Sequence, residues 1–196
     1  MANKLRCAIV TDDGRPEIFG AIVKHGLKEE SVDKNGNFTL RFKHYYSQDA
    51  VDASKEPLKG VVNSSGYNIH ERTFNISQLT TESTERAYHD LATEYLEEVY
   101  GYWNVENLQY GKYLESNIPV SGKIIEGEPG YGVIRLQLLS SGDTVMEVNV
   151  GHTEGGGEIA TVTLTPGAPS EFVIDYSTDD IWVSDLVMFK AKLLKT

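Results

Sequence analysis

Residues 148–164, VNVGHTEGGGEIATVTL, gather the side chains best suited to chemistry. His152, Glu154 and Glu158 are of the types that bind metal ions, and the three consecutive glycines between them could form a loop that holds phosphate. A phosphate loop needs a helix after it, because the helix N-terminus supplies aligned amides. The segment that follows here alternates β-branched residues, as a strand does. The sequence therefore predicts a hairpin turn, with no metal ion bound.

Other chemical groups are dispersed along the chain. Four further histidines lack the spacing of a helical metal pair and are expected at surface or sheet positions: His25, His44, His70 and His89. The one cysteine, Cys7, lies in an apolar stretch, where a thiol behaves as a small hydrophobe. Neither a serine-nucleophile elbow nor a Walker A loop is present. We expect no catalytic residue and no cofactor, although paired carboxylates leave an unrecognised hydrolase as a third hypothesis.

Aromatic side chains are concentrated in residues 95–113, YLEEVYGYWNVENLQYGKY. Tyrosine and tryptophan are enriched at protein interfaces, and they also stack on sugar rings. Three hypotheses stay open for this segment: a core that joins a helix to a β domain, a protein interface, or a sugar-binding platform. The candidate interface residues are Tyr95, Tyr100, Tyr102, Trp103, Tyr110 and Tyr113. The candidate carbohydrate-binding residues are Trp103 and Trp182.

The charge balance bears on possible partners. The 196 residues include 29 acidic and 18 basic side chains, a formal net charge of −11. Nucleic acids and anionic membranes are bound mainly through lysine and arginine, so neither is an expected partner. No apolar run approaches the ~20 residues of a membrane-spanning helix. The apolar stretch near the start is too short for a signal-peptide core, so we expect a protein that is assembled in the cytoplasm.

Three zones are predicted along the chain. Residues 1–79 form a strand-rich N-terminal region with a long loop at 47–68, because residues 38–46 alternate apolar and polar side chains. Residues 80–117 hold an amphipathic helix and the aromatic junction, the apolar residues of 81–101 recurring at helical spacing. Residues 118–196 form a β domain.

Five strands are expected in this last zone, with turn residues between them. They are residues 132–140, 144–150, 158–164, 171–176 and 180–194. Closely spaced strands of this kind are typical of antiparallel sandwiches and barrels. The predicted fold class is mainly β (α+β), with a C-terminal antiparallel β-sandwich or jelly-roll-like domain. Whether the two β regions form one domain is left open.

Two resemblances bear on function. The ending EFVIDYSTDD followed by IWVSDLVMFKAKL resembles the closing strand of carbohydrate-binding and galactose-binding-like jelly-roll modules, over residues 118–196. The acidic, cysteine-poor, short-stranded chain also resembles bacteriophage virion components. The second resemblance implies a non-enzymatic structural protein, capsid- or tail-associated, that assembles with itself and with neighbouring structural proteins. The alternative is a carbohydrate-binding β-sandwich module of adhesin-like type.

Overall fold

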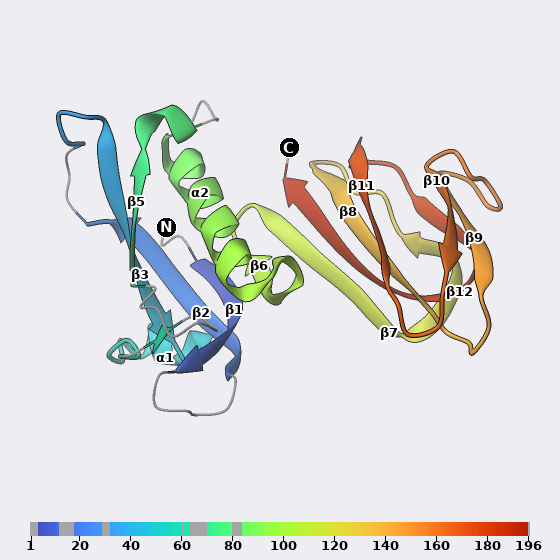
Figure 1. The fold of residues 1–196 in the computed structure, drawn as a ribbon, viewed down its shortest axis with the longest axis horizontal. Helices are drawn as coiled ribbons and strands as arrows, with labels where there is room; N and C mark the ends of the chain where they lie inside the picture. The colour runs from blue at the N-terminus through green and yellow to red at the C-terminus, as the bar shows by residue number, and fades with distance from the viewer. Residues whose placement is uncertain are drawn as a thin grey trace. The chain divides into compact units, whose positions relative to one another are not determined.

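The computed structural model shows a mainly β protein with antiparallel sheets (Figure 1). It describes residues 4–11, 18–28, 32–59, 61–62, 70–79 and 84–195. The chain divides into two compact units, Met1–Gln109 and Tyr110–Thr196, and each unit has its own hydrophobic core. The helical zone expected between the two β regions lies in the first unit, where its apolar face shares a core with the strands.

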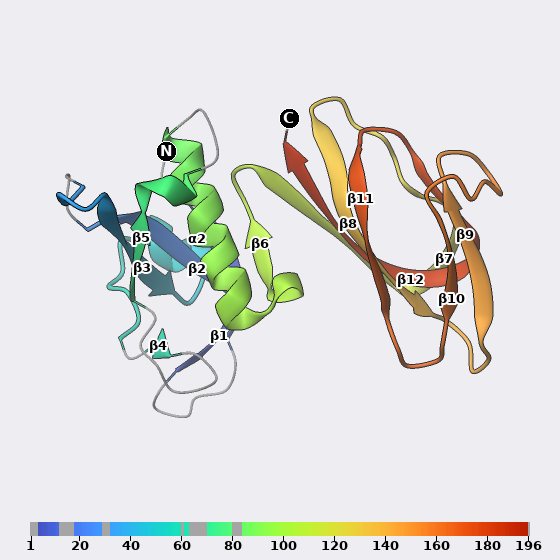
Figure 2. The same cartoon turned by 45° about the horizontal axis from the view of Figure 1, so that its top comes forward.

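The first unit is a six-stranded antiparallel sheet with a long helix on one face (Figure 2). Its strands are β1 (Lys4–Thr11), β2 (Ile18–Leu27), β3 (Asn37–Tyr45), β4 (Val61–Val62), β5 (Glu71–Asn75) and β6 (Val105–Asn107). Its helical segments are α1 (Gln48–Asp52), η1 (Ile76–Gln78), α2 (Thr84–Tyr100) and η2 (Tyr102–Asn104). The strand order is β4-β1-β2-β3-β5, and β6 pairs with β1 beside β4.

Alternation along β3 sets the two faces of this sheet. Phe38, Leu40, Phe42 and His44 are buried on the face that α2 covers, which confirms the strand predicted at residues 38–46. The side chains between them point to the opposite face, which we call the outer face. Because directly paired residues of neighbouring strands share a face, the register assigns the residues of β1, β2 and β5 in the same way.

The predicted helix is confirmed as α2. Leu91 and Ala92 are adjacent, Leu96 follows about one turn later, and all three are buried against the sheet, as the helical spacing requires. The helix ends where Gly101 takes a φ of 92°, a left-handed conformation that favours glycine. The Gly101 N–H donates to the carbonyl of Glu97 at 2.9 Å, so the last turn stays hydrogen-bonded.

Part of the long loop predicted at residues 47–68 is regular structure. Ser47 caps α1, and Val51 in that helix is buried. α1 lies against β2 and β3 and covers one end of the outer face, where Ile22 is also buried. Val61 and Val62 form β4, whereas residues 60 and 63–69 lie outside the described residues.

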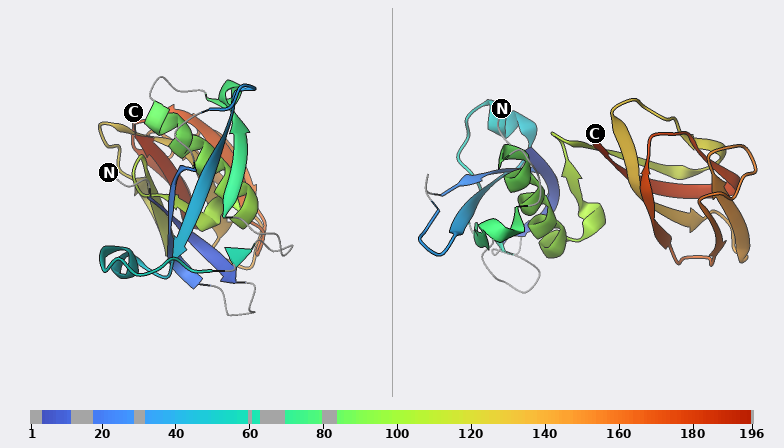
Figure 3. Two further views of the ribbon diagram at one scale, coloured as in Figure 1. Left: turned by 90° about the vertical axis from the view of Figure 1, so that its left-hand side faces the viewer. Right: turned by 90° about the horizontal axis from the view of Figure 1, so that it is seen from above.

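The second unit is one antiparallel sheet that curls until it is nearly a barrel (Figure 3). Its strands are β7 (Gly111–Ile125), β8 (Tyr131–Ser140), β9 (Met146–Gly151), β10 (Ala160–Leu164), β11 (Ser170–Ser177) and β12 (Ile181–Lys195). The strand order is β10-β9-β12-β8-β11, and β7 pairs with β12. β12 contacts β9 through its first residues and β8 through its last, so this long strand binds the sheet together.

All five strands predicted in this region are confirmed, but β7 was not predicted. Three register shifts interrupt its pairing with β12, two of them on either side of Val120. Pro119 and Gly122 lie at the same place, and most of its side chains are at least partly exposed. β7 lacks a regular alternation of apolar side chains, so the two-residue period that indicates a strand is absent from its sequence.

Within the described residues, no helix is both long enough and apolar enough to span a lipid bilayer.

Candidate functional site

The histidine- and glutamate-containing segment is a hairpin, as predicted. Residues 152–159 connect β9 to β10, and Glu158 folds back over the turn. Its carboxylate accepts hydrogen bonds from the His152 N–H at 3.2 Å and from the Thr153 hydroxyl at 3.0 Å. Its own backbone N–H, then Thr153, lower the pKa of Glu158. The carboxylate therefore closes the turn, while Glu154 is exposed to solvent.

The hairpin glycines make room for that carboxylate. A Cβ on Gly156 would lie 2.3 Å from a Glu158 carboxylate oxygen, and one on Gly151 would lie 2.7 Å from the Gly156 carbonyl oxygen. Glycine at these places permits a close approach and is not a sign of phosphate binding. Over the part of the chain that the structure describes, no three His, Cys, Asp or Glu side chains converge as metal ligands.

A histidine pair lies buried between the first sheet and α2. His25 Nε2 and His89 Nδ1 are 2.8 Å apart, and His89 Nε2 is 2.8 Å from Asn107 Oδ1. The Gln109 N–H donates to the same Oδ1, which identifies that atom as the acceptor. His89 therefore donates from Nε2 and, while neutral, accepts from His25 at Nδ1. This order leaves His25 Nδ1 as a buried acceptor with no partner among the described residues.

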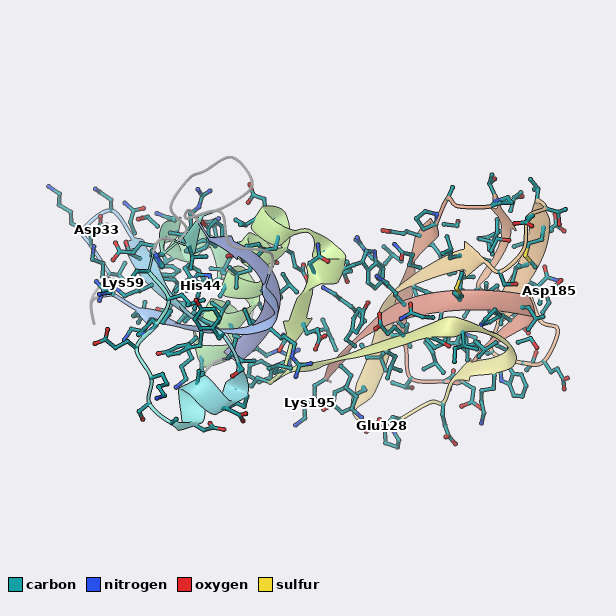
Figure 4. All side chains as sticks on the ribbon, turned by 90° about the horizontal axis from the view of Figure 1, so that it is seen from below. Asp33, His44, Lys59, Glu128, Asp185 and Lys195 are labelled. Carbon is teal, nitrogen blue, oxygen red and sulfur yellow. The ribbon has the colours of Figure 1, made fainter. Side chains whose placement is uncertain are left out.

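A second histidine cluster lies on the same face, at the far end of α2. His44 is fully buried inside the first unit (Figure 4), and its Nε2 lies 3.1 Å from the Tyr100 hydroxyl. The His70 ring meets it edge-on, with 5.6 Å between ring centroids. Burial, and next the charge of His70, lower the pKa of His44 to about 3. Burial, and next the charge of His89, lower the pKa of His25 to about 3.

Burial lowers the pKa of His25, His44 and His89, so these three imidazoles favour the neutral form at physiological pH. Buried imidazoles without charge can position their neighbours through hydrogen bonds, but they lack the access to solvent that proton exchange with a substrate requires. The expectation for His89 was wrong, because it is a buried helix residue and neither a surface nor a sheet histidine. Helical spacing carries the missing signal: His89 stands three residues before Ala92 and seven before Leu96, on the apolar side of the helix.

The candidate aromatic residues fall into different surroundings. The Tyr95 ring packs against Phe42 and Phe74, and burial raises the pKa of its hydroxyl. Tyr100 takes part in the His44 cluster, and the Tyr102 and Trp103 rings meet edge-on at 5.1 Å. Those four belong to the first unit, whereas two belong to the second: Tyr110 and Tyr113. The side chains of all six are partly buried.

The side chain of Cys7 lies outside the described residues. Its backbone belongs to β1 and pairs with Ala21 on one side and with Val105 on the other.

A hollow of about 680 Å³ opens at one end of the second unit. It is lined by Gly127, Pro129, Gly130, His152, Thr178, Asp179 and Asp180. Asp180 accepts from the Gly127 N–H at 2.7 Å and pairs with Lys123 at 3.2 Å. The Lys123 ammonium also lies 5.9 Å from the centre of the Trp182 ring. Lys123 therefore connects Trp182 with Asp180, a residue that lines the hollow.

Exposed apolar side chains mark the outermost strands of the second unit. Ile118 on β7 is 74% exposed and Val173 on β11 is 66% exposed, the two highest values among the large apolar side chains described. In the described part of the chain, β7 pairs with β12 alone, β11 with β8 alone and β10 with β9 alone. β11 approaches β10, but no ladder of hydrogen bonds joins them.

Comparison with protein families, with curated proteins and with solved structures finds no match to this chain.

Proposed function

We propose that this chain is a non-enzymatic structural protein that assembles through the outermost strands of its second unit. The observation that carries the proposal is the exposure of Ile118 and Val173 on strands that are hydrogen-bonded on one side only. Unpaired strand edges and exposed apolar side chains are features that proteins cover when they associate. The partner proposed is a second copy of the chain, and neighbouring structural proteins would dock in the same way.

β11 is the better docking strand of the two. β7 carries Pro119 and three register shifts, devices that prevent a further strand from pairing with an edge. Residues Ser170–Val173 of β11 pair regularly with β8, ahead of the one register shift in this pairing, and contain no proline or lysine. The proposed interface therefore centres on Val173, with Ile118 as a second apolar contact.

The second unit would serve as the rigid scaffold of such an assembly, with the sandwich or jelly-roll-like arrangement expected from the sequence. A capsid- or tail-associated place in a bacteriophage virion, after assembly in the cytoplasm, is the specific form of this proposal. It fits a protein that repeats one apolar contact many times between identical copies.

Light scattering over a concentration series tests the association. We expect the average mass to rise above the monomer mass of 21.8 kDa as the concentration increases. Val173→Lys places a charge in the proposed interface and should weaken the association at least tenfold, a loss of about 1.4 kcal/mol.

Val145→Lys is the matched control. Val145 is 62% exposed, but it lies in the turn between β8 and β9, outside β7 and β11. Val145→Lys introduces the same charge and removes the same apolar side chain as Val173→Lys does. Because Val145 lies outside the proposed interface, association should persist. A wild-type protein that stays monomeric at millimolar concentration, or equal losses in the two variants, would refute the proposal.

Carbohydrate binding is a second candidate, favoured by the hollow beside Trp182. Asp179 and Asp180 line it, and carboxylates accept hydrogen bonds from sugar hydroxyls while an indole ring stacks on the sugar face. Lys123 lies over the Trp182 ring, so a sugar would have to displace it.

Glycan-array screening with two tryptophan variants tests this candidate. Trp182→Ala should abolish binding, and Trp103→Ala in the first unit should leave it unchanged. Binding lost only in Trp103→Ala would move the sugar site to the aromatic segment, and absence of binding to any glycan would reject the candidate.

A further inference from the structure

Two lysines form a short row across the outer face of the first sheet. Lys24 on β2 is directly paired with Lys43 on β3. In the sequence these residues are about twenty positions apart, so no basic cluster is visible there. Like charges placed directly opposite one another destabilise a sheet. The arrangement is therefore one that the folded chain maintains at a cost in stability.

A pocket of about 310 Å³ lies beside this row. It is lined by Lys24, His25, Gly26, Leu27, Arg41, Lys43 and Tyr45. Gly26 faces Arg41 across the strand pair, and a Cβ built on it would meet nothing within 4 Å. Gly26 is the second-last residue of β2, and a missing side chain there leaves a hollow in an otherwise level sheet face. The volume of this pocket is at the lower end of the range found for small-molecule binding sites.

The charges around the pocket are incompletely balanced. Among the described residues, neither Lys24 nor Lys43 has a carboxylate within ion-pairing distance. The Lys24 ammonium lies 5.9 Å from the centre of the Tyr45 ring. Arg41 pairs with Glu71 at 3.1 Å, and the same carboxylate also binds Lys28. An excess of positive charge therefore stands at one pocket of a chain whose net charge is −11.

We propose that this pocket binds the phosphoryl group of a small ligand, held by the ammonium groups of Lys24 and Lys43 with Arg41 at its edge. A phosphoryl group carries up to two negative charges and several acceptor oxygens, so one ligand can satisfy both lysines at once. Its binding would also remove the repulsion along the lysine row. The Tyr45 ring is placed to contact the organic part of such a ligand.

The site belongs to the first unit, and the association proposed for the second unit does not depend on it. Because the pocket is open to solvent, binding should be weak and should decline as salt screens the charges. The measurements therefore require low ionic strength, with sodium chloride at matched ionic strength as the reference.

Thermal unfolding and amide NMR test the proposal, with inorganic phosphate and phenyl phosphate as the probes. We expect either anion to raise the melting temperature of the wild type beyond the effect of chloride, because a ligand of the folded state stabilises it. The amide signals of Lys24, Gly26 and Lys43 should shift on titration. Tighter binding of phenyl phosphate would identify a phosphorylated organic ligand, and tighter binding of phosphate the free anion.

The double variant Lys24→Gln/Lys43→Gln should bind at least tenfold more weakly. Without ligand it should be as stable as the wild type or more so, because the lysine row is relieved. The matched control is Lys34→Gln/Lys55→Gln, which removes two exposed lysines elsewhere and changes the net charge equally. It should bind like the wild type.

Three results would overturn the proposal. The first is a wild type that responds to phosphate no more than to chloride. The second is an equal loss of binding in the two double variants, which would indicate a general charge effect. The third is a set of NMR shifts that excludes the three pocket amides.

Discussion

At the scale of single residues, the main feature of the first unit is its buried histidines. His44 packs inside the sheet–helix core, and the groups that face it are the Tyr100 hydroxyl and the His70 ring. Asn107 fixes the tautomer of His89 and, through it, that of His25. Burial lowers the pKa of His25, His44 and His89, so protonation of these three imidazoles must oppose folding.

The first prediction concerns pH. The unfolded chain protonates His44 below about pH 6.5, whereas burial, and next His70, lower the pKa in the folded state to about 3. Stability is therefore kept above pH 6.5 and lost as the pH falls from 6.5 towards 3. One such group contributes up to about 1.4 kcal/mol per pH unit. Urea unfolding at pH 7, 6, 5 and 4 measures the slope of the unfolding free energy.

His44→Phe is the informative variant for this slope. It keeps a ring of similar size and removes the proton-binding site, so the free energy of unfolding should fall less steeply with decreasing pH. A slope identical to that of the wild type would show that His44 does not set the acid sensitivity.

Sequence reasoning at this scale recognised the turn at residues 152–159 because the local strand pattern sufficed. It could not find the histidine pairs. His25 and His89 lie 64 positions apart, and His44 and Tyr100 lie 56 apart, so their contacts exist only once α2 is placed on the sheet. The lysine row was hidden for the same reason, since strand register creates it.

At the scale of elements, the β9–β10 hairpin shows how local packing selects glycine. The Glu158 carboxylate and the Gly156 carbonyl both occupy space that a side chain on Gly151 would need. Of these two neighbours, only the carboxylate is at the end of a flexible side chain. An alanine at Gly151 therefore forces the backbone of the hairpin to move.

The second prediction follows from this crowding. Gly151→Ala should lower the free energy of unfolding of the second unit by about 2 kcal/mol, the usual size of an overpacking effect. Gly157→Ala is the control, because its new Cβ would lie 3.4 Å from the nearest atom, an ordinary contact. Urea unfolding compares the two, and equal stabilities would contradict the close approach seen at Gly151.

Helices and strands with a regular apolar period could be predicted from the sequence. β7 has no such period and could not. The period of α2 and the alternation of β3 each follow from one face packing on a core. β7 is held by its ladder with β12, and neither Pro119 nor Gly122 indicates a strand. Its existence depends on a partner that comes more than fifty residues later in the chain.

At the scale of the whole molecule, the chain has two cores that differ in composition. The first contains three buried histidines, His25, His44 and His89, whereas the buried hydrophobic cluster of the second consists of aliphatic residues and Phe189. Acid should therefore weaken the first unit selectively.

The third prediction uses the two tryptophans, since Trp103 lies in the first unit and Trp182 in the second. Fluorine NMR of protein labelled with 5-fluorotryptophan reports the thermal unfolding of each unit separately. Between pH 7 and pH 5 the transition at Trp103 should move to lower temperature by more than that at Trp182. Equal shifts at both tryptophans would contradict a selective effect on the first unit.

The central claim is that copies of the chain meet at the outermost strands of the second unit. Hydrogen–deuterium exchange at low and high protein concentration tests it most directly. We predict that peptides from β11, and to a smaller extent β7, become more protected at high concentration while peptides from β3 and α2 do not change. Exchange in β11 that is independent of concentration, under conditions where the protein is associated, would contradict the account.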